Sequence, residues 1–478
     1  MATQHESHQT VSITKIVTVY PKVLQPQRVL NLSNLDRQCH MLMYLVFFYN
    51  NPSDHQAYEN LSPNSVFNSL KYGLEVTLSV WYPAAGRLSL NRSDGTELNL
   101  LCNNDGAILV EAMTRVKISE LGDFSEYNEF FENLVYKPVI DGNFSKMPLL
   151  VAQVTRFGCG GYSIGIGASH SLFDGPAAYS FFTAWAYNST IVKRECVIEL
   201  HKPVHERGTL LLGNSQASKG ITTLPTTSNP QIRPAAIDHL YQLIMQETSE
   251  KKKSYEHQLP QIGGSDQKNK YVLKTYHLST AMMQDLKKKH FFYGRDYLHY
   301  SSFEVLSAHL WKARTKALGL SKEKMVCLQF SVDTRKKMVP PLPESFSGNA
   351  YVLASVILTV GELEEASHEA IIEKIRAAKK TVNNDYVKVY IEALKEGQQA
   401  SLPPLKELTL VSDWTRMPFH KIEFFHGQAA YASPLFPPVP QVVYFMQNPI
   451  DNGGVDIRIG LDAQTINAFT YYFLTNVQ

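Results

Sequence analysis

An apolar segment, Tyr162–Gly167, leads to His170 and is followed by Asp174 and Gly175. The segment is typical of a buried strand and Pro176–Asn188 of a helix, so His170 lies at a strand-to-helix turn. An imidazole can take up and return a proton near neutral pH, which makes a histidine at such a strand end a candidate general base. A histidine in an apolar strand is more often a core residue, but the neighbouring glycines allow close backbone approach and favour the functional interpretation.

We expect Asp174 to act on the turn and not on the substrate. A salt bridge from its carboxylate would fix the turn that aims the imidazole of His170. The His-x-x-x-Asp spacing alone is a weak signal, and the strand, glycine and helix around it make it much stronger. A Ser-His-Asp hydrolase triad is not indicated, because no Gly-x-Ser-x-Gly elbow joins a strand to a helix.

The length and the patterning predict two mixed α/β domains. A chain of 478 residues is too long for one ordinary core. Glycine-containing turns at 158–161 and 451–454 predict two hairpins, and apolar residues at three- and four-residue spacing predict a helix that ends at Gly319. We predict an N-terminal domain at 1–190, a crossover linker at 191–227 and a C-terminal domain at 228–478.

The composition excludes several classes of protein. The net charge of +2 gives no reason to expect nucleic acid as a partner. The N-terminus lacks the apolar region of a secretory signal and no apolar stretch approaches about 20 residues, so we expect no transmembrane segment. Five cysteines without metal-ligand spacing indicate reduced thiols and no metal site, and hence a cytoplasmic protein.

The run from His170 through Asp174 to Gly175 resembles the HxxxDG signature of the plant BAHD acyltransferases, which use acyl-CoA thioesters. Six further segments in the family's order extend the resemblance over nearly the whole chain, and Asp413 replaces the middle serine of one of them. In the first half, Leu32–Arg37 resembles the family's LSxLD segment and Tyr82–Leu88 its YPLAGR segment. In the second half, Ser301–Glu304 resembles the start of the second-domain helix, Val332–Arg335 the DxR segment, Phe346–Asn349 the FGN segment and Ser412–Trp414 the TSW segment.

The sequence also indicates a clade and one departure from the family. Within the family, the sequence most resembles that of the clade that acylates brassinosteroid hormones. The segments that carry this resemblance are Leu32–Cys39, Val80–Leu88, Tyr136–Pro138 and Leu402–His420. The family's structural DFGWG stretch stands here as Glu423–Gly427, with Phe425 in place of a glycine and His426 in place of the tryptophan. We expect this loop to pack differently, and we do not expect His426 to be a second base, because it has no strand-end context.

The resemblance implies a chloramphenicol acetyltransferase-like α/β fold, with two similar domains that are each a mixed β-sheet covered by helices and an active-site channel between them. It implies no permanently bound cofactor, and a monomer. Acyl-CoA would be a co-substrate and a hydroxylated hydrophobic molecule the acceptor. Ser302 and Asn349 are the implied CoA-binding residues. The lysines at 287–289 could attract CoA phosphates, although such a run is more often a solvated helix face.

The resemblance further implies direct attack of the acceptor on the thioester. His170 would take the proton of the acceptor hydroxyl and return one to the CoA sulfur. The indole N–H of Trp414, together with the Ser412 hydroxyl, would stabilise the oxyanion. Asp174 would hold the turn, with Arg335 as a candidate partner.

Several alternatives stay open. The chain could transfer a hydroxycinnamoyl group to a phenolic or amine acceptor, or it could be a catalytically silent member that binds a hydrophobic ligand. A condensation-type enzyme is less favoured, because such enzymes have a double histidine where Ser169 precedes His170 here. Association with the surface of the endoplasmic reticulum is also left open.

Overall fold

The computed structural model divides the chain into two compact units. Unit 1 takes its described residues from Met1–Leu211, Pro343–Ala350 and Met417–Phe436, and unit 2 from the remainder. The described residues are 10–39, 41–50, 62–90, 98–139, 144–189, 200–211, 271–290, 300–394, 407–425, 427–435 and 441–475.

This division differs from the contiguous domains that the sequence predicts. Two later segments, Pro343–Ala350 and Met417–Phe436, belong to unit 1 because they pair and bond with its early strands and turns. In the second of them, β13 (Tyr431–Leu435) is antiparallel to β3 (Leu42–Tyr49). Residues 200–211 of the predicted linker also belong to unit 1, and residues 212–227 lie outside the described part.

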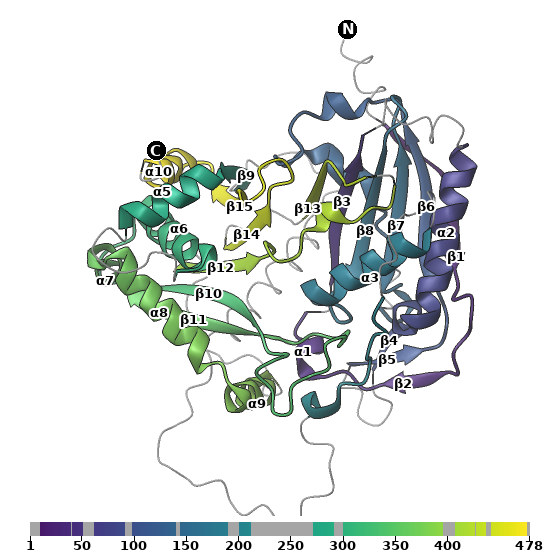
Figure 1. Cartoon of the computed structure of the whole chain (residues 1–478), viewed down its shortest axis with the longest axis horizontal. Coiled ribbons are helices and arrows are strands. Elements are labelled where there is room, and N and C mark those ends of the chain that lie inside the picture. Colours follow the sequence, from purple (N-terminus) through teal and green to yellow (C-terminus); the bar gives the residue numbers. More distant parts are fainter. Residues whose placement is uncertain are drawn as a thin grey trace, which may run out of the picture. The chain divides into compact units, whose positions relative to one another are not determined.

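Unit 1 is built on a mixed six-stranded sheet (Figure 1). The predicted hairpin at 158–161 is confirmed, because the strands on either side of it are antiparallel neighbours. The strand order is β1 (Val11–Val19), β6 (Ala107–Thr114), β7 (Leu150–Arg156), β8 (Tyr162–Ser169), β3 and β13, and a smaller sheet contains β2 (Arg28–Leu30), β5 (Leu98–Cys102) and β4 (Arg87–Leu90).

Two helices, α2 (Pro63–Val80) and α3 (Gly175–Ser189), pack against each other along one face of this sheet (Figure 1). Ser62 caps the first turn of α2, and Pro63 fits its first position because that turn needs no amide donor. Trp185 is fully buried between the helices, where its indole N–H donates to the Leu70 carbonyl at 2.9 Å. Short helical segments complete the unit: α1 (Asn34–Arg37), η2 (Tyr82–Ala85), η3 (Ile118–Leu121), η4 (Glu129–Leu134), η5 (Phe144–Lys146), η6 (Gly208–Leu210) and η10 (Phe419–Lys421).

Unit 2 repeats the plan with a second mixed six-stranded sheet. Its strands around the 451–454 turn are antiparallel neighbours, which confirms the second predicted hairpin. The strand order is β11 (Tyr351–Thr359), β10 (Met325–Asp333), β12 (Leu408–Asp413), β14 (Val442–Gln447), β15 (Val455–Asp462) and β9 (Tyr271–Leu278).

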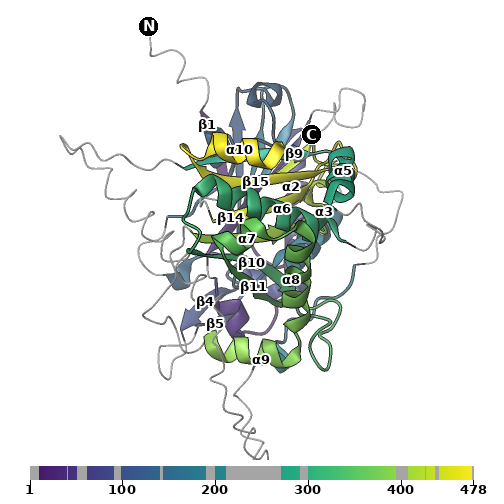
Figure 2. The same ribbon diagram turned by 90° about the vertical axis from the view of Figure 1, so that its left-hand side faces the viewer.

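Helices line one face of the unit 2 sheet (Figure 2). The predicted helix is confirmed as α6 (Ser302–Leu318), which begins with a capping box between Ser301 and Glu304 and ends at Gly319, whose φ is +59°. The other helices are α5 (Thr280–His290), α7 (Val360–Glu365), α8 (His368–Thr381), α9 (Asn384–Ala393) and α10 (Ile466–Leu474).

Each unit therefore has the mixed sheet and helical layer that the sequence predicts. None of the helices in the described ranges combines the length and the hydropathy required to cross a lipid bilayer.

Candidate active site

His170 directly follows β8, an inner strand of the unit 1 sheet that pairs with β3 on one side and β7 on the other. Its backbone N–H donates to the Met41 carbonyl at 2.9 Å, so the residue is fixed to the end of the sheet. The glycines of β8 serve close approach, as the sequence predicts: a Cβ at Gly167 would lie 2.5 Å from the Tyr44 ring, and one at Gly165 would overlap a backbone carbonyl oxygen. His170 thus follows directly on a tightly packed strand.

The surroundings of His170 favour a neutral imidazole. The residue is half-buried, and burial is the largest influence, lowering its pKa from the usual value. Its own backbone carbonyl, the charge of Asp174, a hydrogen bond with Asn349 and the charge of Asp36 all act in the opposite direction without reversing the shift. An unprotonated imidazole is the form that a general base requires.

Asp174 holds the turn through backbone hydrogen bonds. Its Oδ1 accepts from the Ala177 N–H at 3.1 Å, in the first turn of α3, and its Oδ2 accepts from the Ala350 N–H at 3.0 Å. These two bonds orient the turn, and the salt bridge that the sequence predicts for Asp174 stays a prediction. Arg335 belongs to unit 2, where it lies 3.3 Å from Asp333, so its role as partner of Asp174 stays a prediction.

Asn349 is fully buried, at 0% exposure, and the CoA-binding role that the resemblance implies for it stays a prediction. Its side-chain N–H donates to the His170 carbonyl at 2.7 Å and to Asp36 Oδ1 at 3.1 Å. A buried amide that donates to two protein acceptors joins the segments that carry them. The matched family segment therefore contributes a hydrogen-bonded neighbour of His170.

Ser412 and Trp414 lie at the end of β12 in unit 2. The Trp414 indole N–H donates to Ser412 Oγ at 3.0 Å, and its ring packs edge-on against Tyr444, with centroids 5.2 Å apart. The backbone N–H of Trp414 donates to the Phe445 carbonyl at 2.8 Å. Because the indole N–H is directed at Ser412 Oγ, the hydroxyl proton of Ser412 is the one left to donate outward.

Ser302, the other predicted CoA-binding residue, is exposed at the start of α6. The ammonium group of Lys287 lies 3.2 Å from its hydroxyl, and burial lowers the pKa of Lys287. The structure thus brings together Ser302 and one member of the predicted lysine run. Lys288, the next member, lies 3.6 Å from Asp285 on the same helix face.

Phe424 and Phe425, in the altered stretch, are part of the unit 1 core. The Phe425 ring stacks on Tyr162, with centroids 5.1 Å apart, and packs against Tyr49 at 4.9 Å. Phe424 packs edge-on against Trp185 at 4.8 Å. The changed packing expected from the sequence is therefore an added aromatic contact, and His426 lies outside the described residues.

Sequence reasoning missed Arg207 and gave Asp36 no role. The two form an ion pair at 2.9 Å in which both side chains are 0% exposed. Arg207 falls in the predicted linker, and only the LSxLD resemblance drew attention to Asp36. A Gly-x-Ser-x-Gly sequence does occur at 161–165, but Ser163 is fully buried within β8, so the sequence forms no nucleophile elbow.

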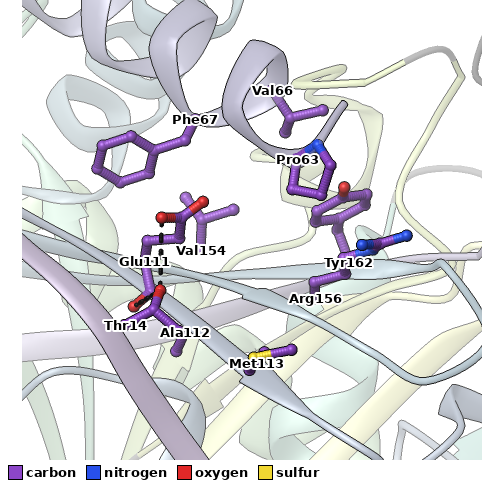
Figure 3. A pocket seen from close by; sticks show the side chains of 10 residues that line it. All are labelled: Thr14, Pro63, Val66, Phe67, Glu111, Ala112, Met113, Val154, Arg156 and Tyr162. Carbon is purple, nitrogen blue, oxygen red and sulfur yellow. Dashed lines mark hydrogen bonds between the residues drawn. The ribbon is translucent and has the colours of Figure 1, made fainter. Parts of the chain in front are cut away.

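A separate pocket of about 230 Å³ lies in unit 1 under the first turns of α2 (Figure 3). None of the predicted site residues lines it. Val66, Phe67 and Val154 form its apolar part, and Arg156 and Tyr162 lie together at one side (Figure 3). Through Tyr162 the pocket adjoins the core that contains Phe425.

Comparison with known proteins decides the family. A family model described as "Transferase family" matches residues 9–473. The chain belongs to the BAHD acyltransferases. It is 52% identical to Brassinosteroid-related acyltransferase 1 of Arabidopsis thaliana, with 97% of this chain and 98% of that protein covered. It is 27% identical to Omega-hydroxypalmitate O-feruloyl transferase of the same plant, over 93% and 88% of the two chains.

Solved structures of two proteins share the fold of this BAHD acyltransferase. Vinorine synthase matches with a TM-score of 0.69 at 18% identity, covering 98% of this chain and 99% of its own. F. graminearum TRI101 in complex with coenzyme A and T-2 mycotoxin matches with a TM-score of 0.66 at 14% identity, covering 92% and 96%. These matches confirm the predicted fold class.

Proposed function

We propose that this BAHD acyltransferase moves an acyl group from a CoA thioester to a hydroxyl of a hydrophobic plant metabolite, with a brassinosteroid as the first acceptor to test. The observation that carries the proposal is the position of His170 in the HxxxD turn at the end of β8, where burial lowers the pKa of its imidazole. The 52% identity with a protein named for brassinosteroids supports the acceptor class. Acyl-CoA is the co-substrate, and no resident cofactor takes part.

His170 acts as the general base in this proposal. The imidazole accepts the proton of the acceptor hydroxyl while the hydroxyl oxygen forms a bond to the thioester carbon. The tetrahedral intermediate collapses with cleavage of the carbon–sulfur bond, and the imidazolium returns the proton to the departing CoA sulfur. One group thus handles the proton in both directions, and no serine or cysteine of the chain is acylated.

Ser412 and Trp414 are the proposed donors for the oxyanion of that intermediate. The hydrogen bond from the indole to Ser412 Oγ supports a chain of donors in which the Ser412 hydroxyl makes the contact and Trp414 orients it. A donor that is already oriented does not need to reorganise when the charge develops. This order differs from the expectation from sequence, which gives Trp414 the leading part.

The test is release of free CoA thiol by purified protein. Wild type would be compared with His170→Ala and with the matched control His201→Ala, because His201 is an exposed histidine of the same unit. Short-chain, long-chain and hydroxycinnamoyl CoAs would be combined with brassinosteroid, phenolic and amine acceptors. We expect acceptor-dependent release that falls by about 10²–10⁴-fold in His170→Ala and persists in His201→Ala.

Two results would redirect the proposal. Release with a hydroxycinnamoyl donor and a phenolic or amine acceptor alone would replace the acceptor class, leaving the chemistry intact. Folded protein that binds CoA or steroid and releases no thiol with any pair would instead indicate the silent, ligand-binding alternative.

A further inference from the structure

Asp36 lies in an environment that is costly for a carboxylate, because it is fully buried. Burial by itself would raise its pKa, but the charge of Arg207 and hydrogen bonds from Arg207, Asn349 and Ser33 outweigh it and lower the pKa. Its two oxygens accept from Ser33 N–H and Oγ–H, from Arg207 Nε and Nη2, and from Asn349 N–H and Nδ2 at 2.7–3.2 Å. We call Asp36, Arg207 and Asn349 the Asp36 network.

Stability alone is a weak reason for such an ion pair. The cost of removing two charges from water can exceed their attraction, and well-packed apolar residues often do as well. The network also joins segments that are far apart in the chain, at positions 36, 207 and 349. We therefore take the role of the buried charges to be the specific arrangement of the polar groups that these three segments bring together.

That arrangement reaches the base through one amide. Asn349 Nδ2 donates both to Asp36 Oδ1 at 3.1 Å and to the His170 carbonyl at 2.7 Å. An ionised carboxylate can only accept, so it selects the NH₂ side of the amide and excludes the flipped orientation, which would place two oxygens together. The charge of Asp36 thereby decides that a donor faces the His170 carbonyl.

The carbonyl belongs to the residue that carries the imidazole. The backbone N–H of His170 donates to the Met41 carbonyl at 2.9 Å, and its own carbonyl accepts from Asn349 Nδ2 at 2.7 Å. Both peptide groups of the residue are held, and with them the backbone from which the ring is aimed. Burial lowers the pKa of the imidazole, and the hydrogen bond with Asn349 acts against that shift.

We propose that the buried Asp36–Arg207 ion pair positions His170 for proton transfer by fixing the side-chain amide of Asn349. Asp36, Arg207 and Asn349 are positioning residues, since none of them touches the reacting atoms. The catalytic meaning of this inference rests on the proposed function, whereas the orientation of His170 does not.

Three variants separate positioning from folding. Asn349→Ala removes the amide and leaves the ion pair. The double variant Asp36→Asn/Arg207→Gln removes both charges without leaving one unpaired in the core, which single substitutions would do. Arg37→Gln is the matched control, because Arg37 lies beside Asp36 in α1 but donates to the Leu98 carbonyl at 2.7 Å and to Asn34, away from His170.

The first readout needs no turnover. The imidazole of His170 would be titrated by NMR in histidine-labelled full-length protein, with His170→Ala identifying its signals. Asp174, on the turn, and Asp36, on α1, are the charged groups that raise its pKa, together with the Asn349 amide. We expect the midpoint to move to lower pH in Asn349→Ala and in the double variant, and to stay in place in Arg37→Gln.

The second readout is kinetic. We expect kcat to fall by roughly tenfold to a hundredfold in both network variants with KM for the acyl-CoA unchanged, because a small misplacement of the base affects the transition state and not donor binding. If folded Asn349→Ala keeps both the wild-type midpoint and the wild-type kcat, the inference is overturned. If wild type transfers no acyl group but the midpoint still moves, the proposed function fails and the positioning role stands.

Discussion

The buried histidines His205 and His309 predict that both units lose stability in mild acid. His205, in unit 1, is 5% exposed, with Nδ1 2.7 Å from Ser347 Oγ and Nε2 2.9 Å from the Val80 carbonyl oxygen. His309, in unit 2, is 1% exposed, with Nε2 2.7 Å from the Phe473 carbonyl oxygen. Burial is the main cause that lowers the pKa of each to about 4, although the carbonyl contacts oppose it.

The size of the effect follows from these pKa values. In the unfolded chain each imidazole binds a proton near pH 6.5, whereas in the folded protein it does so only near pH 4. The unfolded state therefore holds more protons between these values, and the free energy of unfolding falls as the pH falls. For each histidine the full loss is roughly 3 kcal/mol, of which about 2 kcal/mol occurs between pH 7 and pH 5.

Urea unfolding at pH 7 and pH 5, followed by tryptophan fluorescence and circular dichroism, measures this loss. His205→Gln and His309→Gln should each lose about 2 kcal/mol less than wild type between the two pH values, because the substituted group does not titrate. His201→Gln is the control, since His201 is exposed, and should behave as wild type. The same loss in wild type and in His205→Gln would show that the fold does not hold His205 neutral.

Three further predictions concern the site and its supports. Gly165→Ala should lower the free energy of unfolding by roughly 1–3 kcal/mol or more, because its methyl group would overlap a backbone carbonyl oxygen. The control Gly175→Ala should lower it much less, because there the methyl group meets only the end of a methionine side chain, and equal melting temperatures of the two variants would contradict this reasoning. Ser412→Ala should lower kcat by about 10²–10³-fold and Trp414→Phe by less, because the indole acts through the hydroxyl. If the double variant loses the product of the two single effects, the donors act independently and this chain of donors is wrong. Phe425→Ala should lower the free energy of unfolding, measured with urea, by about 3–5 kcal/mol, because the ring is buried against two tyrosines. A decrease below about 1 kcal/mol would show that the ring is loosely packed.

The parts of the fold that depend on near neighbours could be predicted from the sequence. Glycine turns between apolar segments placed both hairpins, and the spacing before Gly319 placed α6 and its end. His170 was found because a strand, a glycine and a helix surround it within a short stretch. In each case the residues that decide the structure lie within one or two elements of one another.

The parts that depend on distant pairing could not be predicted. Arg207 and Asp36 are 171 residues apart, and neither has a local pattern that announces a buried charge. The same limit explains the domain boundary: β13 joins a sheet whose neighbouring strand, β3, lies nearly 400 positions earlier in the chain. Asn349 was identified by its motif, but its hydrogen bonds to Asp36 and His170 could not be predicted, because a motif specifies residue types and not burial.

Activity and stability should respond to acid separately, and the variants above can distinguish them. Burial lowers the pKa of His170, so its imidazole stays unprotonated and able to accept a proton below pH 6.5. As the pH falls, protonation of His205 and His309 in the unfolded chain first lowers the free energy of unfolding, and we expect kcat/KM to stay constant over that range. The value of kcat/KM should fall, reversibly, only as His170 itself is protonated. His205→Gln should reduce the acid loss of stability and leave the fall in kcat/KM where it is, whereas Asn349→Ala should move that fall to lower pH. If His205→Gln moved both, the fall in activity would report unfolding and not protonation of the base.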